Sequence, residues 1–282
     1  MAVCRPQFAQ TYLVCVFAMF CLYERLFVLY CKGNDVTMRE DNPDLPEDDT
    51  LTWRQGPEAP LPYFYEVQGP GDVPAVVKVL AAARYHPHTL DALMQASLPH
   101  VVPVLAHHRW GSVAYIMMPR MAGNLRAALP CDFQPSVFEQ ITRGVAALHD
   151  SGWVHGEIKP ENILLDAAGQ PYLADFDTVT AIHAPMQHGV SPAYCAPEII
   201  LRQPVTPQTD IYALGVMLWE WLAGYHPFVG QRLTQVLHSH LHAPLPLLEG
   251  AAARYNDAIQ RATRKDPALR WARADDLLSD MM

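Results

Sequence analysis

The sequence has no excess of basic residues. Its 282 residues include 20 Lys and Arg against 29 Asp and Glu, which gives a formal net charge of −9 at pH 7. A nucleic-acid-binding protein normally presents a basic face, and here the Lys and Arg residues are also scattered along the chain. No nucleic-acid partner is therefore expected.

Cysteines are few and ungrouped. Four of the six lie within the first 31 residues, only Cys131 and Cys195 fall in the rest of the chain, and no C-x-x-C pair occurs. This arrangement supports neither a structural zinc site nor a disulfide framework. Reduced thiols in a cytosolic compartment are the simpler interpretation.

A long uninterrupted hydrophobic run is also missing. Residues 8–31 are mostly apolar, but Glu24 and Arg25 interrupt them. The clean run over 12–23 is shorter than the roughly 20 residues that a membrane span needs. A signal peptide is a weaker alternative, because no A-x-A cleavage site follows the run.

Two interpretations stay open for residues 1–37. One is a membrane anchor that leaves the following domain in the cytoplasm, and the other is an upstream extension ahead of a true start at Met38. In the first interpretation, membrane association would depend on residues 8–31. Residues 33–50 are predicted to form an acidic, proline-containing linker.

After the linker the pattern changes from strand-like to helix-like. The runs YFYEV (63–67) and AVVKVL (75–80) flank a QGPGDVP turn, which predicts a β-hairpin. The other predicted elements are helices over 89–98, 136–152 and 209–224 and a buried strand over 112–118. The last helix is expected to begin on a Thr–Asp cap and to end at Gly224. We predict an α+β fold with a small β-rich lobe over 51–118 and a larger helical lobe over 119–282.

Five motifs then occur in a fixed order. They are HGEIKPEN (155–162), ADFD (174–177), SPAYCAPE (191–198), Asp210 followed by Gly215, and Arg270 in DPALRW. Together they resemble the eukaryotic-type (Hanks-type) Ser/Thr protein kinase family, from about residue 51 to the C-terminus. The resemblance implies a bilobal protein-kinase-like fold, a buried Asp210 and an ion pair between Arg270 and Glu198. It also implies transfer of a phosphoryl group from ATP to a protein hydroxyl.

The same resemblance implies a set of nucleotide-binding residues. Lys78, on the predicted strand over 75–80, would contact the phosphates. Asp91 is either its helix partner, one methylene shorter than the family's Glu, or a solvated helix residue. Gly56 lies 22 positions before Lys78 (78 − 56), where the first glycine of a G-x-G-x-x-G loop is expected. Met118 is the last of the expected nucleotide-binding residues.

On the catalytic side, Asn162 and Asp175 are the expected ligands of Mg²⁺, with Mn²⁺ as an alternative, because a hard cation prefers carboxylate and amide oxygens. Lys159 would face the γ-phosphate. Glu157 occupies the position of the family's catalytic Asp and would hydrogen-bond the incoming hydroxyl. Its extra methylene displaces the carboxylate by about 1 Å, and such a displacement can cost about 10²-fold in rate.

Several departures from the family pattern weaken this interpretation. Glu58 and Leu61 stand where the second and third glycines of the phosphate loop are expected, and nearby prolines remove N–H donors. Gly156 replaces the Arg that would pair with a phosphorylated activation loop. Asp177 replaces a Gly and is expected to add negative charge near the metals. The remaining candidates for modification are Thr178, Thr180 and Ser191.

The sequence leaves two functions open. One is an atypical Ser/Thr protein kinase that uses ATP and Mg²⁺ on a protein substrate, and retention of the Lys, Asn and Asp residues favours it. The alternative is a pseudokinase that binds a protein partner, with weak or no nucleotide binding. Phosphorylation of a small molecule is disfavoured by the A-P-E element. The HSHLH run (238–242) lacks a completing ligand and is interpreted as structural.

Overall fold

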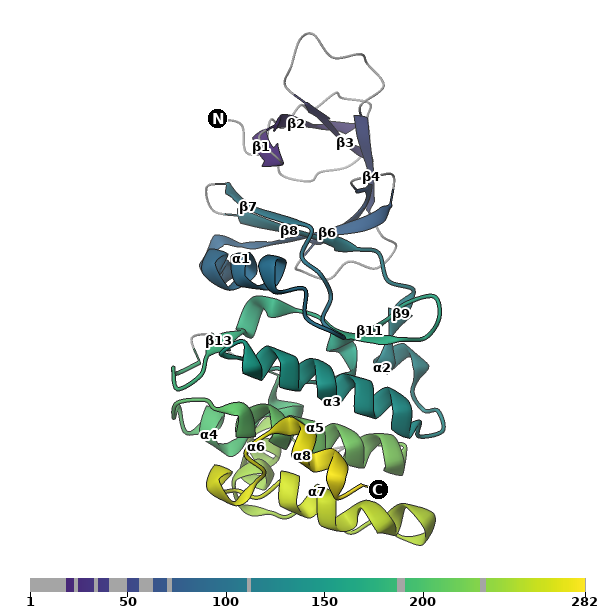
Figure 1. The fold of residues 1–282 in the computed structure, drawn as a ribbon, viewed down its shortest axis with the longest axis vertical. Helices are drawn as coiled ribbons and strands as arrows, with labels where there is room; N and C mark the ends of the chain where they lie inside the picture. The colour runs from purple at the N-terminus through teal and green to yellow at the C-terminus, as the bar shows by residue number, and fades with distance from the viewer. Residues whose placement is uncertain are drawn as a thin grey trace. The chain divides into compact units, whose positions relative to one another are not determined.

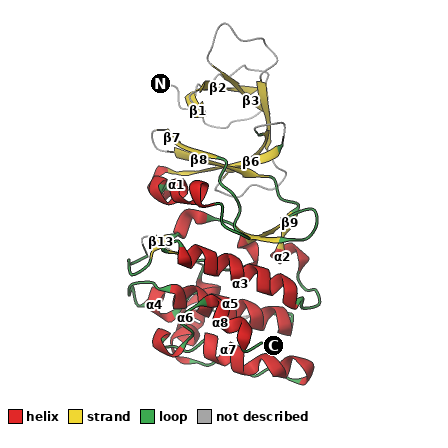
Figure 2. Cartoon of the chain, in the orientation of Figure 1, coloured by secondary structure: helices red, strands yellow, loops and turns green. Residues whose placement is uncertain are grey.

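The computed structural model describes residues 19–22, 25–32, 35–40, 50–55, 63–69, 73–110, 113–186, 191–228 and 232–281. The chain divides into two compact units, which are Met1–Met94 with Pro103–Arg120 and Gln95–Val102 with Met121–Met282. The first unit holds a large β-sheet and the second is mainly helical (Figure 2). The predicted α+β class is thus confirmed, whereas the exact lobe boundaries stay a prediction.

Within the described residues of the first unit, eight antiparallel strands pair in the order β1-β2-β3-β4-β5-β6-β8-β7 (Figure 1). They are β1 (Met19–Leu22), β2 (Arg25–Lys32), β3 (Asp35–Glu40), β4 (Thr50–Gln55), β5 (Tyr63–Gln68), β6 (Pro74–Ala81), β7 (Ala106–Trp110) and β8 (Val113–Pro119). Strand β6 has neighbours on both edges and buries Ala75, Val77 and Leu80. Small and β-branched residues suit such a pleated, half-buried surface.

The predicted hairpin is confirmed. Strands β5 and β6 pair in the register that sets Tyr63 opposite Val79. The N–H of Gly69 donates to the carbonyl of Val73 at 2.8 Å and closes the turn. The strand and the helix predicted next are also present, as β8 and as α1 (Pro87–Ala96), each shifted by one or two residues.

The helical unit is built around α5. Its helices are α2 (Leu125–Ala128), α3 (Pro135–Asp150), α4 (Pro197–Ile200), α5 (Pro207–Ala223), α6 (Leu233–His242), α7 (Asn256–Ala262) and α8 (Ala274–Ser279). Its short strands are β9 (Gly123–Asn124), β10 (Trp153–Val154), β11 (Ile163–Leu165), β12 (Pro171–Leu173) and β13 (Thr180–Ala181). Helix α5 contacts α3, α7 and α8 (Figure 1). Helix α5 has apolar residues on every side, and it is buried along most of its length together with the polar Asp210 and Glu220.

One cap differs from its prediction. Helix α5 ends as expected at Gly224, which has φ +79°, but it begins three residues earlier than the predicted Thr–Asp cap. Thr206 is the N-cap, and it exchanges side-chain and backbone hydrogen bonds with Thr209 in a capping box. Pro207 takes the first helical position, where its missing N–H costs nothing. The predicted cap is wrong because Thr209 is the second half of this box.

The described parts of the N-terminal segment lie in strands. Strand β3 falls inside the predicted linker over 33–50, and its backbone pairs with β2 and β4. That ladder satisfies backbone groups which a linker would leave to water. No helix in the described part of the chain is long and apolar enough to cross a membrane. The membrane anchor and the alternative start at Met38 stay predictions.

Candidate active site

A buried carboxylate fixes the loop over 155–162, which connects β10 to β11. Asp210 is fully buried, as predicted. Its Oδ1 accepts the N–H of Gly156, and its Oδ2 accepts the N–H of His155 and the Nε2–H of His149, each at 2.8 Å. Burial raises the pKa of Asp210, but the hydrogen bonds from His149 and from the N–H of Gly156 outweigh it, so the pKa lies below its ordinary value. The loop is therefore attached to an ionised anchor on α5.

Gly156 has a steric role that its sequence position did not reveal. Its φ is +77°, and a Cβ at this position would lie 2.6 Å from Cε of Met186. A side chain would be strained by the backbone and would collide with Met186. The positive φ and the end of the Met186 side chain thus both disfavour the Arg that the family places here.

The predicted pair Glu157 and Lys159 is brought together, and Ser191 joins it. Oε1 of Glu157 accepts from Nζ of Lys159 at 2.7 Å and from the N–H and hydroxyl of Ser191 at 2.9 and 2.5 Å. Nζ of Lys159 also donates to the Ser191 hydroxyl at 2.7 Å. Burial raises the pKa of Glu157, but the hydrogen bonds from Lys159 and Ser191 lower it below its ordinary value. Glu157 is therefore an anion at neutral pH.

The two predicted metal ligands are also neighbours. Nδ2 of Asn162 donates to the carbonyl of Glu157 at 2.8 Å. A carbonyl can only accept, so the amide nitrogen faces it and Oδ1 of Asn162 is the atom left for a cation. The main-chain carbonyl of Asn162 accepts the N–H of Ala174 at 2.9 Å. This bond brings the next residue, Asp175, beside Asn162. Asp175 has φ +71°, a conformation that Asp adopts more readily than most residues.

Two residues after Asp175 are buried, and for one of them an expectation is corrected. Asp177 lies buried within the turn Phe176–Thr178, and its effect on a bound metal stays a prediction. Thr178 is buried as well, and its hydroxyl donates to the carbonyl of His155 at 2.9 Å. A buried, bonded hydroxyl is a poor target for modification. The prediction was wrong because the sequence alone does not show that this turn packs under the loop.

Beside these residues lies a shallow cleft of about 560 Å³. Its lining includes Lys159, Asn162 and Ser191. Arg126 crosses it, donating to Glu161 at 2.7 Å through Nε and to Glu220 at 2.7 Å through Nη1. The hydroxyl of Tyr194 donates to Glu220 as well. The sequence pattern does not reveal this cluster, because its members come from separate segments.

A model of the protein kinase domain matches residues 90–281. The chain belongs to the protein kinase family. Serine/threonine-protein kinase PknL of Mycobacterium tuberculosis is 32% identical over 165 residues, which cover 55% of this chain and 41% of PknL. Serine/threonine-protein kinase PrkC of Bacillus subtilis is 34% identical over 160 residues, covering 52% of this chain and 24% of PrkC. The kinase chain thus spans less than half the length of these relatives.

A solved structure agrees with the family. The Cydia pomonella granulovirus kinase PK-1 matches 79% of this chain and 92% of its own with a TM-score of 0.68, at 18% sequence identity. The bilobal kinase fold and the resemblance to Hanks-type Ser/Thr kinases are therefore confirmed. The predicted kinase ion pair is present too, since Arg270 donates to both oxygens of Glu198 at 2.7 and 3.0 Å in a buried site.

The remaining predicted site residues of this kinase lie in the β-rich unit. Lys78 is 3% exposed on β6, a strand with partners on both sides, so it is not an ordinary edge-strand lysine. Met118 is buried on β8 opposite Val76. Oδ1 of Asp91 accepts a hydrogen bond from Nε2 of His107 at 3.2 Å, and its side chain is 55% exposed, while its pairing with Lys78 stays a prediction.

The phosphate loop of the kinase cannot be placed in the same way. Gly56, Glu58 and Leu61 lie outside the described residues.

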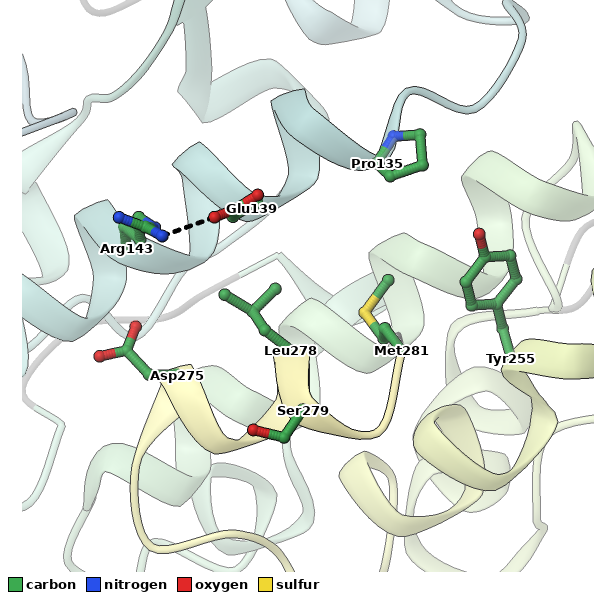
Figure 3. Close-up of a pocket in the computed structure, with 8 residues that line it drawn as sticks. All are labelled: Pro135, Glu139, Arg143, Tyr255, Asp275, Leu278, Ser279 and Met281. Atoms are coloured by element: carbon green, nitrogen blue, oxygen red, sulfur yellow. Dashed lines mark hydrogen bonds and ion pairs between the residues drawn. The ribbon is translucent and has the colours of Figure 1, made fainter.

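A second cavity, of about 430 Å³, lies on the helical unit beside α3, α8 and Tyr255 (Figure 3). Its polar wall includes Glu139 and Arg143, which pair with each other at 2.6 Å. None of the predicted site residues lines this cavity, so it is not part of the candidate active site.

Proposed function

We propose that this domain is an active, ATP- and Mg²⁺-dependent Ser/Thr protein kinase in which Glu157 supplies the carboxylate for the substrate hydroxyl. The observation that carries the proposal is the arrangement around this carboxylate. Every hydrogen bond that the described residues make to it falls on Oε1. Oε2 is then left for a hydroxyl from a substrate.

The chemistry follows from these positions. Oε2 of Glu157 accepts the hydrogen bond of a Ser or Thr hydroxyl and takes its proton as the hydroxyl oxygen bonds to the γ-phosphorus of ATP. The bond between the γ-phosphorus and its bridging oxygen breaks, and ADP leaves with that electron pair. Lys159, whose Nζ lies 2.7 Å from Oε1, places a positive charge beside the transferred group.

The metal requirement rests on the donor set. Oδ1 of Asn162 and the carboxylate of Asp175 are hard oxygen donors that fit Mg²⁺, with Mn²⁺ as an alternative. When bound there, the cation would neutralise charge on the phosphates. Lys78 and Met118 in the β-rich unit are proposed to contact the nucleotide. The cytoplasm is the proposed compartment, because ATP is the phosphoryl donor.

A protein substrate is proposed to lie in the cleft beside Ser191. The cleft is lined by Lys159 and Ser191, which both donate to the carboxylate of Glu157. A peptide chain could thus present its hydroxyl without entering a closed cavity. The Thr178 hydroxyl is buried and is not part of this surface.

The test is phosphoryl transfer by the full chain. Labelled ATP with Mg²⁺ or Mn²⁺ and a generic Ser/Thr protein substrate should give incorporation, which Asp175→Ala should abolish and Asp132→Ala, at an exposed carboxylate, should leave unchanged. No incorporation, together with no nucleotide-induced thermal shift at any concentration of either metal, would support the pseudokinase alternative.

A further inference from the structure

A single carbonyl in the substrate loop, defined as residues 191–198, accepts two imidazole hydrogen bonds. The oxygen of Ala193 lies 3.0 Å from Nε2 of His226 and 2.9 Å from Nε2 of His240. His226 follows α5 and His240 is fully buried on α6, so the two rings reach the loop from different elements.

The protonation of both rings follows from their other partners. Because the Ala193 carbonyl only accepts, Nε2 carries the proton in each ring. Nδ1 of His226 accepts the N–H of Phe228 at 3.2 Å. Nδ1 of His240 accepts the hydroxyl of Tyr212 at 2.9 Å. Burial lowers the pKa of both histidines, that of His240 to about 4, so both are neutral at pH 7.

On the α6 side the hydrogen bonds run in one direction. Nζ of Lys265 donates to the oxygen of Tyr212 at 3.2 Å, the hydroxyl of Tyr212 donates to His240, and His240 donates to Ala193. A chain of this kind polarises each successive donor. Every polar atom of the buried ring has a partner, so the ring orientation is fixed.

The clamped residue lies two positions after Ser191, whose N–H and hydroxyl both donate to Glu157. We propose that His226 and His240 are positioning residues for the substrate loop, which hold Ala193 so that Ser191 stays on Glu157. This inference rests on the proposed kinase activity of the same site. The peptide substrate is the ligand whose binding depends on it, because the cleft is lined by both Ser191 and Ala193.

An ordinary packing role for the histidines would not require these bonds. One donor already satisfies a buried carbonyl, and a second ring costs the burial of further polar atoms unless each is bonded. His238, two residues before His240 on α6, provides a matched comparison. This residue is exposed, and its ring contacts that of His242 in a tilted arrangement with 4.6 Å between centroids.

The kinetic test compares His240→Leu and His226→Leu with His240→Gln and His226→Gln, all in the full chain. Leu removes the donor, whereas the Gln amide can still donate to Ala193. We expect both Leu variants to lose about 10- to 100-fold in kcat/KM for a peptide substrate, with KM for ATP unchanged. The Gln variants should regain most of the loss, and the control His238→Leu should match the wild type.

A second readout does not depend on activity. Amide hydrogen exchange of residues 191–196 should be faster in both Leu variants than in the wild type, and slower again in the Gln variants. If His240→Leu does not fold, His226→Leu, at a partly exposed position, carries the test. Folded Leu variants with wild-type exchange would overturn the clamp. A wild type that transfers no phosphate would overturn the kinase proposal alone, because the exchange result still decides the clamp.

Discussion

Two carboxylates on either side of Gly156 are used in opposite ways. Asp210 is fully buried, and both of its oxygens accept hydrogen bonds from the loop and from His149. Glu157 is 14% exposed and engages Oε1 only. Both have a pKa below the ordinary value in spite of burial. The two carboxylates therefore differ in how many of their oxygens accept hydrogen bonds and in their exposure to solvent. Asp210 holds the loop in place, whereas Glu157 keeps one oxygen for a substrate.

Removing the scaffold carboxylate should have the largest effect. Asp210→Ala leaves the N–H groups of His155 and Gly156 and the ring of His149 without their acceptor. A buried donor left without an acceptor typically costs about 1–3 kcal/mol, and three donors are affected here, so the total reaches several kcal/mol. We expect a loss of that order in the free energy of unfolding, measured by denaturant titration. Asp150→Ala, at an exposed ion pair, should change little, and equal effects of the two variants would contradict the scaffold role.

Glu157 should show the reverse behaviour. Glu157→Gln keeps the size of the side chain but removes the proton acceptor, so kcat should fall by roughly 10²- to 10⁴-fold. The free energy of unfolding should change by about 1 kcal/mol, because the amide can still accept from Ser191. Steady-state kinetics and denaturant titration measure both quantities. Glu139→Gln is the control, and wild-type kcat in Glu157→Gln would assign the chemistry to another group.

His240, which holds the substrate loop, also predicts that the free energy of unfolding depends on pH. The pKa of His240 is about 4 in the folded protein and 6.5 in the unfolded chain, where the ring is not buried. The unfolded chain therefore takes up the proton first as the pH falls. The stabilisation is complete above pH 6.5 and is lost progressively towards pH 4. Between pH 6.5 and 5 the loss is about 2 kcal/mol at most.

Denaturant titrations at pH 7, 6 and 5 test this dependence. His240→Gln should lose less stability than the wild type over that range, whereas His238→Gln should follow the wild type. Tyr212 and Lys265 stay protonated throughout the range, and His226 shifts in the same direction as His240. If the wild type and His240→Gln lost the same free energy of unfolding between pH 7 and pH 5, His240 would not be the group responsible.

Much of the fold could be predicted from the sequence, because its signals are local. The hairpin turn, the apolar periodicity of α3 and Gly224 at the end of α5 each depend on a few neighbouring residues. The start of α5 was misplaced because Thr206 and Thr209 both have capping side chains, and only the backbone shows which one is the N-cap.

The site was predicted less completely. Residues inside motifs, such as Glu157 and Lys159, were found because their spacing is itself the signal. The contacts of Met186 with Gly156, of His240 with Ala193 and of Arg126 with Glu220 join distant segments, and no local pattern marks them. Such contacts depend on how the elements pack, and that packing leaves no local trace in the sequence.

The smallest expected effect concerns Gly156, which lies between the two carboxylates. At φ +77° any other residue is disfavoured by roughly 1–2 kcal/mol, so Gly156→Ala should destabilise by about that amount. The new methyl would also meet Met186, but the end of a methionine side chain can move. Adding Met186→Ala should therefore recover only a part of the loss, because the backbone strain stays.

The control is Gly123→Ala, since a Cβ there would have no atom within 4 Å and its φ is not left-handed. Full recovery in the double variant would mean that contact with Met186, and not the backbone, selects glycine at position 156. No loss in Gly156→Ala would mean that the loop can relax without this turn. In that case the hydrogen bonds to Asp210 alone would suffice to set the position of Glu157.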